Sequence, residues 1–145
     1  MDYDAEKNRN GPADGGKHDG LFILLISIHG LIRGENLELG RDADTGGQIK
    51  YVLELTRALA RQPEVAQVTL LTRRIEDAQV DEDYAQPVEE LGPGARIVRL
   101  DAGPKGYLPK ETLWDHLETF TDNALSYLRS IGKQPDLVHS HYADG

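Results

Sequence analysis

The segment with the clearest potential for chemistry is DTGGQ, residues 44–48. Its two adjacent glycines, Gly46 and Gly47, let a ligand approach the main chain closely, because neither carries a Cβ atom. They stand at the start of a predicted helix, where the first N–H groups are free and the helix dipole favours negative charge. The segment therefore predicts a binding site for a phosphate or a similar anion.

The same segment also has a purely structural interpretation. Thr45, followed three residues later by Gln48, fits the capping box, in which these two side-chain types satisfy N–H groups of the first helical turn. On the pattern alone, the capping box is favoured over the anion site. The two do not exclude each other, since capping by Thr45 leaves other N–H groups of that turn free.

A second segment, GPKGYLPK at residues 103–110, combines two lysines with several turn-forming residues. Lys110 falls in the first turn of a predicted helix, where a cation opposes the helix dipole. A cation in this unfavourable place indicates a function, such as holding a phosphate. For Lys105, an ordinary solvent-exposed surface lysine is an equally good interpretation.

The third segment, HSHYADG at residues 139–145, ends a predicted strand. His139 and His141 are two residues apart and therefore point to the same face of that strand. No third ligand with a suitable spacing follows them, so we expect no metal site. Polar residues at this end of a parallel strand more often line a substrate pocket. The sequence contains no Ser-His-Asp or Cys-His arrangement, no G-x-G-x-x-G motif and no Walker motif.

The elements that must position these segments alternate between strands and helices. Apolar runs predict the strands, and apolar residues at helical spacing predict the helices. In chain order they are strand 21–29, helix 46–62, strands 65–73 and 95–100, helix 109–131 and strand 136–141. This order is typical of an open α/β sheet with parallel strands, in which ligands bind beyond the carboxyl ends of the strands. The three segments and His29 are therefore expected on one rim, whereas Trp114, beside an apolar helical stripe, is expected in the core.

Two stretches lie outside this regular pattern. The connection GLIRGENLELGRDADTGG, residues 30–47, is far longer than such loops usually are, which favours a functional role. The polar stretch 1–19 is interpreted as a disordered lead-in, which leaves residues 20–145 as an incomplete domain. The chain stops directly after its last predicted strand, with no helix left to cover that strand, so we expect exposed apolar surface and a longer parent polypeptide.

The composition argues against several classes of protein. The net charge of −9, from 16 Lys and Arg against 25 Asp and Glu, argues against a nucleic-acid binder. The absence of cysteine excludes a disulfide framework and a thiolate metal site. The apolar run 21–28 is too short to span a membrane and lacks the features of a signal peptide, and a cytoplasmic protein is expected. A small anion remains a possible ligand if basic side chains gather locally. Six of them fall in or near predicted loops: Arg33, Arg41, Arg73, Arg74, Lys105 and Lys110.

Four stretches of the sequence together resemble the sucrose-phosphate synthase family of retaining glycosyltransferases. They are LISIHGLIRGENLELGRDADTGGQIKYVLELTRALA (25–60), LLTRRI (70–75), GYLPKETLW (106–114) and LVHSHYADG (137–145). The resemblance covers nearly everything from Leu21 onwards. It implies the N-terminal Rossmann-like half of a GT-B glycosyltransferase fold, truncated, in which two such halves face each other across the substrate cleft.

The resemblance implies transfer of glucose from UDP-glucose to fructose 6-phosphate, with retention, to give sucrose 6-phosphate and UDP. No cofactor is implied, and UDP-glucose is the co-substrate. The first half of such enzymes mainly holds the acceptor. The expected partners are therefore a small-molecule sugar phosphate, a nucleotide sugar and the missing C-terminal Rossmann-like domain, with neither nucleic acid nor a membrane.

Carried over motif by motif, the resemblance also implies roles for single residues. Gly47 would approach the diphosphate of the donor. The residues that would bind the acceptor are Gly46, Gln48, Lys110, Tyr142 and, as a weaker candidate, Lys105. The catalytic histidine of the family follows the HYADG segment, after Gly145, and most donor-binding residues lie in the second half. No catalytic residue is therefore expected in this chain, which is expected to be inactive alone.

Several alternatives remain open. Sucrose synthase uses free fructose and mannosylfructose-phosphate synthase uses GDP-mannose. The long IRGENLELGRD insert and Lys110 favour a phosphorylated acceptor, while the identity of the donor is not readable. A non-catalytic sugar-phosphate-binding module would contain the same site. A plain α/β domain, whose glycines only shape a helix start, would not respond to sugar phosphates.

Overall fold

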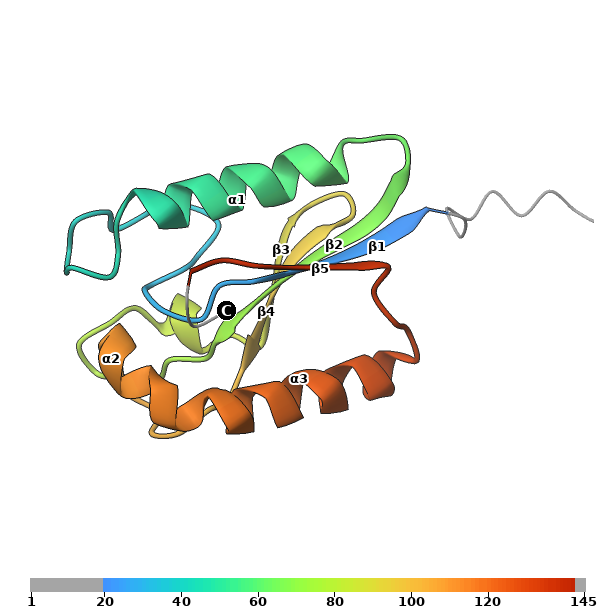
Figure 1. The fold of residues 1–145 in the computed structure, drawn as a ribbon. Coiled ribbons are helices and arrows are strands. Elements are labelled where there is room, and N and C mark those ends of the chain that lie inside the picture. Colours follow the sequence, from blue (N-terminus) through green and yellow to red (C-terminus); the bar gives the residue numbers. More distant parts are fainter. Residues whose placement is uncertain (1–19, 143–145) are drawn as a thin grey trace, which may run out of the picture.

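The computed structural model describes residues 20–142, so the predicted lead-in, 1–19, and residues 143–145 of the HSHYADG segment lie outside the described residues. A five-stranded sheet lies between helices on its two faces (Figure 1). The elements, in chain order, are β1 (Leu21–Ile26), α1 (Gly47–Ala60), β2 (Val65–Arg73), the 3₁₀ turn η1 (Glu82–Ala85), β3 (Val88–Gly92), β4 (Ala95–Leu100), α2 (Lys110–Leu113), the 3₁₀ turn η2 (Trp114–His116), α3 (Leu117–Ile131) and β5 (Leu137–Ser140).

The strands lie in the order β3-β4-β2-β1-β5, and the β4-β2, β2-β1 and β1-β5 pairs are parallel. The inner strands carry apolar residues on both faces, as parallel strands covered by helices usually do. Ile23 and Leu25 of β1 pack in the core beneath α1. Phe22 and Leu24 pack in the opposite core with α3. The predicted open α/β sheet is therefore confirmed.

The helix α1 forms because one side of its sequence is apolar. Ile49, Val52 and Leu53 are buried on that side, as predicted. Lys50 and Glu54 lie on the exposed side, with 3.9 Å between Nζ and Oε1. This helix covers one face of the sheet and brings its first residues to the rim.

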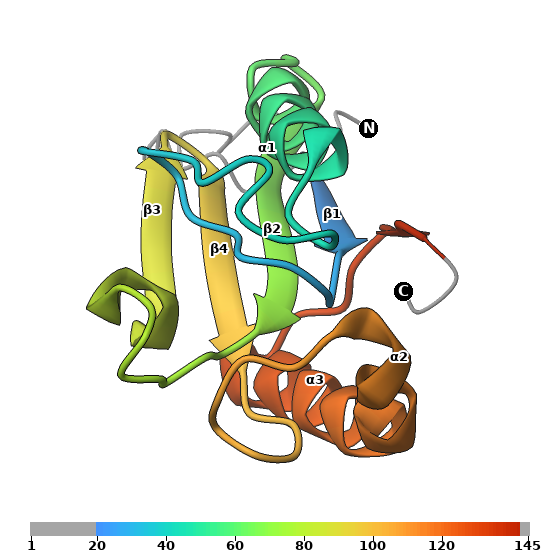
Figure 2. The same ribbon diagram turned by 90° about the vertical axis from the view of Figure 1, so that its left-hand side faces the viewer.

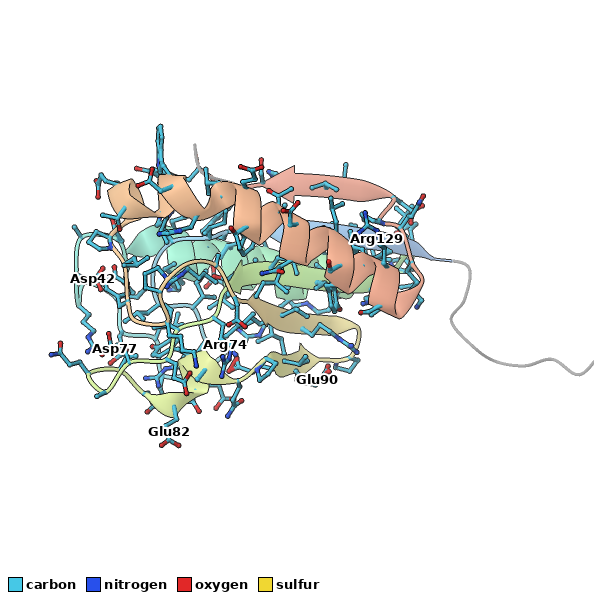
Figure 3. The ribbon with its side chains drawn as sticks, turned by 90° about the horizontal axis from the view of Figure 1, so that it is seen from below. Asp42, Arg74, Asp77, Glu82, Glu90 and Arg129 are labelled. Carbon is cyan, nitrogen blue, oxygen red and sulfur yellow. The ribbon has the colours of Figure 1, made fainter. Side chains whose placement is uncertain are left out.

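The second predicted helix, 109–131, is divided into α2 and α3 by the turn η2. Gly132 ends α3 in a left-handed conformation with φ 65°. Leu113 and Phe120 face the sheet, whereas Trp114 is 61 % exposed, so the prediction that it lies in the core is wrong. One step along a helix turns a side chain by about 100°, which takes Trp114 off the buried stripe. Figure 3 shows α3 crossing the sheet, with Arg129 at the end opposite to Asp42.

The strand β3 lies between the predicted strands 65–73 and 95–100, in a stretch for which the sequence predicts no strand. It pairs with β4 in the antiparallel direction and forms one edge of the sheet. Its sequence, VEELG, carries two glutamates, and Val88 is 46 % exposed, so it lacks the apolar run that marks the inner strands. Charged edge strands are common because charge discourages pairing with another chain. The sheet is therefore mostly, and not entirely, parallel.

The strand β5 forms the opposite edge and is poorly covered. All of its residues are exposed, and Leu137 and Val138 remain 54 % and 53 % exposed. Because neighbouring strand residues point to opposite faces, apolar surface is open on both sides of this edge. The predicted exposure of apolar surface at the last strand is confirmed. Within residues 20–142, no helix combines the length and apolar character needed to cross a membrane.

Candidate functional site

The long loop between β1 and α1 crosses in front of the sheet (Figure 2), and a buried arginine of β4 holds it there. Arg99 is 3 % exposed and donates to the carbonyl of Ile32 at 2.9 Å. It also lies 3.4 Å from Glu89 Oε1, and Glu89 in turn accepts the Gly34 N–H at 2.6 Å. Burial lowers the pKa of Arg99, and the Glu89 carboxylate opposes this change. A buried guanidinium needs such partners, so the loop and β4 depend on each other.

A second arginine fixes the same loop to η1. The Arg33 guanidinium donates to the carbonyl of Asn36 at 2.7 Å and lies 3.4 Å from carboxylate oxygens of Asp81 and Asp83. Its central carbon lies 5.1 Å from the centre of the Tyr84 ring. These contacts make the first part of the long loop a fixed component of the fold.

The turn that leads into α1 is ordered by Thr45 and Asp42. Thr45 is fully buried, and its hydroxyl accepts the Leu31 N–H at 3.1 Å and donates to Asp42 Oδ2 at 3.2 Å. Among the described side chains none caps α1, whose N-cap residue is Gly46. The capping-box prediction for Thr45 and Gln48 is therefore wrong, because the hydroxyl holds the loop instead of the helix.

The start of α1 is open. Around Gly46 and Gly47 no described atom lies within 4 Å of the place where a Cβ would stand, so packing does not explain glycine at either position. At Gly30, by contrast, φ is +83° and a Cβ would stand 2.6 Å from the Asp44 carbonyl oxygen, which explains glycine there. The first turn of α1 also carries no acidic residue. Free N–H groups beside open space suit an anion.

Three buried polar atoms near this rim have no hydrogen-bond partner among the described residues. They are Gln48 Nε2 at the start of α1, Ser27 Oγ directly after β1 and His141 Nε2 directly after β5. Buried polar groups are almost always paired, by protein or by water. Three such atoms at the ends of neighbouring elements therefore indicate a place that a ligand or water completes.

Lys110 approaches the same rim from the start of α2. Its N–H donates to Asp44 Oδ2 at 2.8 Å, and its Nζ lies 3.9 Å from Asp44 Oδ1. The Nζ atom also lies 5.1 Å from the centre of the Tyr142 ring. Tyr142 and, to a smaller extent, Asp44 raise the pKa of Lys110, so its ammonium is charged at neutral pH. The structure therefore brings the three predicted segments together.

The end of β5 contributes aromatic rings to this rim. The His139 and His141 rings are stacked with centroids 4.5 Å apart, which confirms the prediction that they share a face. Tyr142 packs edge-on against His29 at 4.8 Å and has a left-handed backbone with φ 69°. This conformation is unusual for a bulky residue, and such strain is concentrated at functional sites. Burial first, and then the neighbouring His139, lower the pKa of His141.

The other predicted basic side chains have different partners. Lys105 is 75 % exposed at its side chain, and its Nζ lies 3.5 Å from Glu76 Oε2, which fits an ordinary surface lysine. Its role in acceptor binding stays a prediction. The buried Arg73 donates to main-chain carbonyls, including that of Ala102 at 2.8 Å. Arg74 donates to the carbonyl of Ala85 at 2.6 Å. The structure therefore brings Lys110, but not these three side chains, into contact with the DTGGQ segment.

Three side chains that organise the rim, Tyr107, Asp42 and Asp44, were given no role of their own from the sequence. The Tyr107 hydroxyl donates to Asp42 Oδ1 at 2.9 Å and lies 3.5 Å from Asp44 Oδ2. Burial and the hydrogen bond to Asp42 raise the pKa of Tyr107. The Asp-x-Asp spacing directly before the Thr-Gly-Gly run is the signal that points to this pair of carboxylates.

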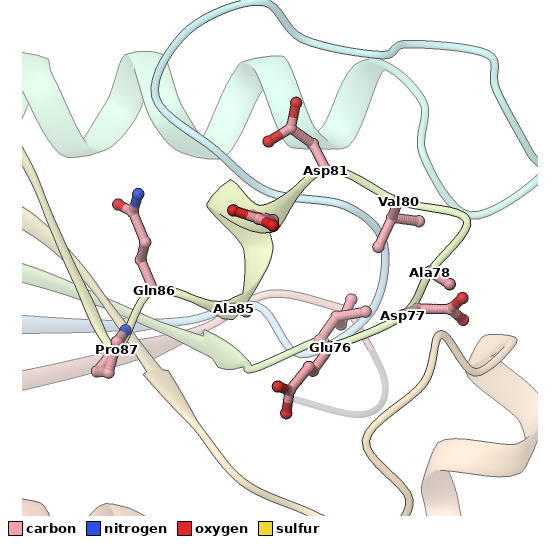
Figure 4. A pocket seen from close by; sticks show the side chains of 10 residues that line it. Glu76, Asp77, Ala78, Val80, Asp81, Ala85, Gln86 and Pro87 are labelled. Atoms are coloured by element: carbon pink, nitrogen blue, oxygen red, sulfur yellow. The ribbon is translucent and has the colours of Figure 1, made fainter.

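A hollow of about 670 Å³ is formed by a different segment, from Ile75 to Pro87 (Figure 4). Its lining includes the carboxylates of Glu76, Asp77, Asp81 and Glu82. Like charges would repel a phosphate, so the hollow is a poor site for the predicted ligand. Over residues 20–142, no group of three or more His, Cys, Asp or Glu side chains has an arrangement that could hold a metal ion. The absence of a metal site stays a prediction.

Residues 46–145 match the Glycosyl transferase 4-like domain. The chain is 47 % identical over 154 residues to probable sucrose-phosphate synthase 2 of Arabidopsis thaliana, which covers 88 % of this chain and 15 % of that protein. It is 48 % identical over 151 residues to probable sucrose-phosphate synthase 4 of Oryza sativa subsp. japonica, with 86 % and 14 % covered. A solved structure of sucrose-phosphate synthase from Thermosynechococcus elongatus is similar with a TM-score of 0.66 and 33 % identity, over 84 % of this chain and 27 % of that one. The chain thus spans 14–15 % of the length of these curated relatives.

Proposed function

The chain belongs to the family of the Glycosyl transferase 4-like domain, and on that premise we propose that it provides the acceptor side of a sucrose-phosphate synthase. In the proposed reaction, glucose passes from UDP-glucose to the anomeric hydroxyl of fructose 6-phosphate, which gives sucrose 6-phosphate and UDP. The similarity to sucrose-phosphate synthases over 86–88 % of the chain supports this choice of reaction.

The observation that carries the proposal is the meeting of Lys110 with the open start of α1. Lys110 is joined to the turn before Gly46 through Asp44, with 3.9 Å between Nζ and Oδ1. A lysine ammonium and free helix N–H groups both bind phosphate readily. The acceptor phosphate is proposed to bind between them.

The neighbouring side chains suit the sugar part of the acceptor. Gln48 Nε2 is a buried donor without a partner in the described part of the chain, and a sugar hydroxyl is a suitable acceptor for it. Tyr142 is 59 % exposed and offers a ring beside Lys110. The Gln48 side chain and the Tyr142 ring together would fix the orientation of the acceptor sugar.

Gly47 is proposed to face the diphosphate of the donor. In the reaction, the bond between glucose C1 and the diphosphate oxygen breaks, while the acceptor oxygen forms a bond to C1 on the same face. The acceptor proton passes to the departing diphosphate, so the protein need not supply a base for it. N–H groups aimed at the departing oxygen stabilise the charge that develops there, which is usually the largest single contribution to catalysis.

The other half of such a site is proposed to come from further sequence of the kind that the longer relatives contain. The described rim has no second cluster of cations for the diphosphate, since Arg73 and Arg74 are bound to carbonyl groups. We therefore expect the 145-residue chain to bind the acceptor without catalysing its reaction.

The proposal is tested by calorimetric titration of the full chain with fructose 6-phosphate. Fructose and inorganic phosphate serve as control ligands, and circular dichroism establishes that the sample is folded. We expect fructose 6-phosphate to bind well above both controls. Equal binding of fructose would favour a sucrose synthase, which uses the free sugar. A folded chain that binds none of the three would contradict acceptor binding by this part of the enzyme.

A further inference from the structure

Asp44 contacts both the main chain and the side chain of Lys110, and the proposed function assigns the carboxylate itself no role. One carboxylate oxygen, Oδ2, accepts the Lys110 N–H at 2.8 Å, while the other, Oδ1, lies 3.9 Å from Lys110 Nζ. One oxygen of the Asp44 carboxylate thus contacts the main chain of Lys110, and the other lies near its side-chain ammonium. Such an arrangement fixes the direction of the lysine side chain as well as the start of α2.

The Asp44 carboxylate is nearly shielded from solvent, with 7 % of its side chain exposed. Removing a carboxylate from water is unfavourable unless it is paired and hydrogen-bonded. Besides Lys110, only the Tyr107 hydroxyl contacts this carboxylate among the described side chains, at 3.5 Å. Lys110 is therefore its main source of compensation.

The backbone of Asp44 is itself held in place. Its N–H donates to Asp42 Oδ1 at 2.9 Å, the same oxygen that accepts the Tyr107 hydroxyl. Its carbonyl oxygen lies so close to Gly30 that a Cβ there would stand at 2.6 Å. A side chain on such a fixed support can direct a flexible partner.

We propose that Asp44 is a positioning residue that holds the Lys110 ammonium beside the start of α1, ready for the phosphate of the acceptor. The identity of the ligand in this inference rests on the proposed function, but the Asp44–Lys110 contact does not. Without Asp44, the lysine side chain would have Tyr142 as its remaining close partner and would sample more rotamers. Asp44 would act on the acceptor through Lys110 and not by direct contact.

The first experiment is a double-mutant cycle with Asp44→Ala and Lys110→Ala in the full chain, with fructose 6-phosphate affinity measured by calorimetry. We expect each single substitution to weaken binding about tenfold, as the loss of a charged hydrogen bond does. If Asp44 acts through Lys110, the double variant binds no more than about twofold weaker than Lys110→Ala alone. If the losses of affinity in the two single variants multiply in the double variant, the proposal is overturned. Asp44→Asn, which keeps an acceptor for the Lys110 N–H, is expected to recover part of the affinity.

The second experiment needs no ligand and uses NMR titration of the Lys110 side-chain ¹³Cε signal. Tyr142, Asp44 and Glu111 are the groups that raise the pKa of this ammonium. We expect a lower pKa for Lys110 in Asp44→Ala than in the wild-type chain, whereas an unchanged pKa and ¹³Cε shift would overturn the proposal. The matched control is Glu54→Ala, whose carboxylate lies 3.9 Å from Lys50 on an exposed helix face. That change should leave the Lys110 signal and the ligand affinity as they are.

The two experiments separate the inference from the proposed function. If the wild-type chain does not bind fructose 6-phosphate, the proposed function is contradicted. The pKa of Lys110 in the Asp44→Ala variant still decides whether Asp44 holds the ammonium. A chain that binds the acceptor through Lys110, but in which Asp44→Ala changes neither affinity nor pKa, contradicts this inference alone. Thermal unfolding of each variant shows whether a loss reflects misfolding.

Discussion

The ammonium of Lys110 lies 5.1 Å from the centre of the Tyr142 ring, although one residue begins α2 and the other follows β5. A cation at this distance from a ring is attracted by its negative face. Tyr142 occupies a left-handed backbone conformation, with φ 69°, while making this contact. The contact therefore joins two loops of the rim at a strained position.

Tyr142→Leu should weaken the binding of fructose 6-phosphate about threefold, because an exposed cation–π contact is worth about 0.5–1 kcal/mol. Tyr142→Phe keeps the ring, so it separates the contribution of the ring from that of the hydroxyl. Calorimetric titration of both variants makes the measurement. If Tyr142→Leu binds like the wild-type chain, the ring does not help Lys110 at the phosphate.

Substitution of the adjacent glycines should separate binding from stability. Gly47→Ala adds a methyl group where no described atom lies within 4 Å, so the free energy of unfolding should change by less than about 1 kcal/mol. Because Gly47 is proposed to face the donor diphosphate, the same methyl group would stand between that diphosphate and the N–H groups of α1, and the binding of UDP-glucose should fall at least about tenfold. Urea denaturation and calorimetric titration measure the two effects.

Gly30→Ala is the control for this experiment. At φ +83° and with a Cβ placed 2.6 Å from the Asp44 carbonyl oxygen, it should lower the free energy of unfolding by more than about 1 kcal/mol. A Gly47→Ala chain that is as unstable as Gly30→Ala would show that the glycine is needed by the fold.

Gln48→Ala is expected to weaken ligand binding without lowering the stability of the fold. The Nε2 atom is buried without a partner among the described residues, so its removal relieves an unsatisfied group and should not lower the free energy of unfolding. Loss of a donor to the acceptor should weaken fructose 6-phosphate binding about tenfold. Gln62→Ala, which removes an exposed side chain bonded to the carbonyl of Ala58, is the matched control. Unchanged affinity in Gln48→Ala would remove this residue from the acceptor site.

The parts of the fold that were predictable from the sequence are those in which local pattern and tertiary packing agree. The strands β1, β2 and β4 are rich in apolar residues because both of their faces are covered. The bounds of β2 and β4 agree with the prediction, whereas β1 ends at Ile26 and not at residue 29. The meeting of the three predicted segments at one rim followed in the same way, since the carboxyl ends of parallel strands share one edge. The edge strand β3 has no such apolar run and was not predictable by this argument.

The details of the rim depend on contacts between residues far apart in the sequence. Thr45 has the spacing of a capping box, but its hydroxyl is bonded to the Leu31 N–H at 3.1 Å and not to α1. Asp44 meets Lys110 only once the sheet has placed α1 and α2 on the same rim. Local spacing carries no information about such partners. The sequence therefore indicates which segments share the rim, but not which of their atoms are in contact.

Arg99→Met should strongly destabilise the chain. The Arg99 side chain is 1 % exposed. Its substitution leaves the Glu89 carboxylate and the Ile32 carbonyl without the guanidinium that donates to them. Breaking a buried pair in this way lowers the free energy of unfolding by about 3 kcal/mol or more. Arg96→Met is the matched control on the same strand, because that side chain is 40 % exposed and faces an exposed Glu90. Urea denaturation of both variants makes the comparison, and similar values would show that the buried arginine does not hold the loop.

The free energy of unfolding should decrease as the pH is lowered, because His141 takes up a proton. Burial and His139 lower the pKa of His141 below its ordinary value of 6.5. As the pH falls through 6.5, the unfolded chain therefore takes up this proton before the folded chain does, and the free energy of unfolding decreases. The contribution of His141 is fully present above pH 6.5 and is lost as the pH falls through the folded-state pKa. Urea denaturation between pH 7.5 and about 5.5 keeps the measurement above the range in which most carboxylates titrate. We expect His141→Gln to flatten this dependence, and His139→Gln to reduce it, because the neighbouring ring no longer disfavours the charged form. A slope that is the same in His141→Gln as in the wild-type chain would show that other groups cause it.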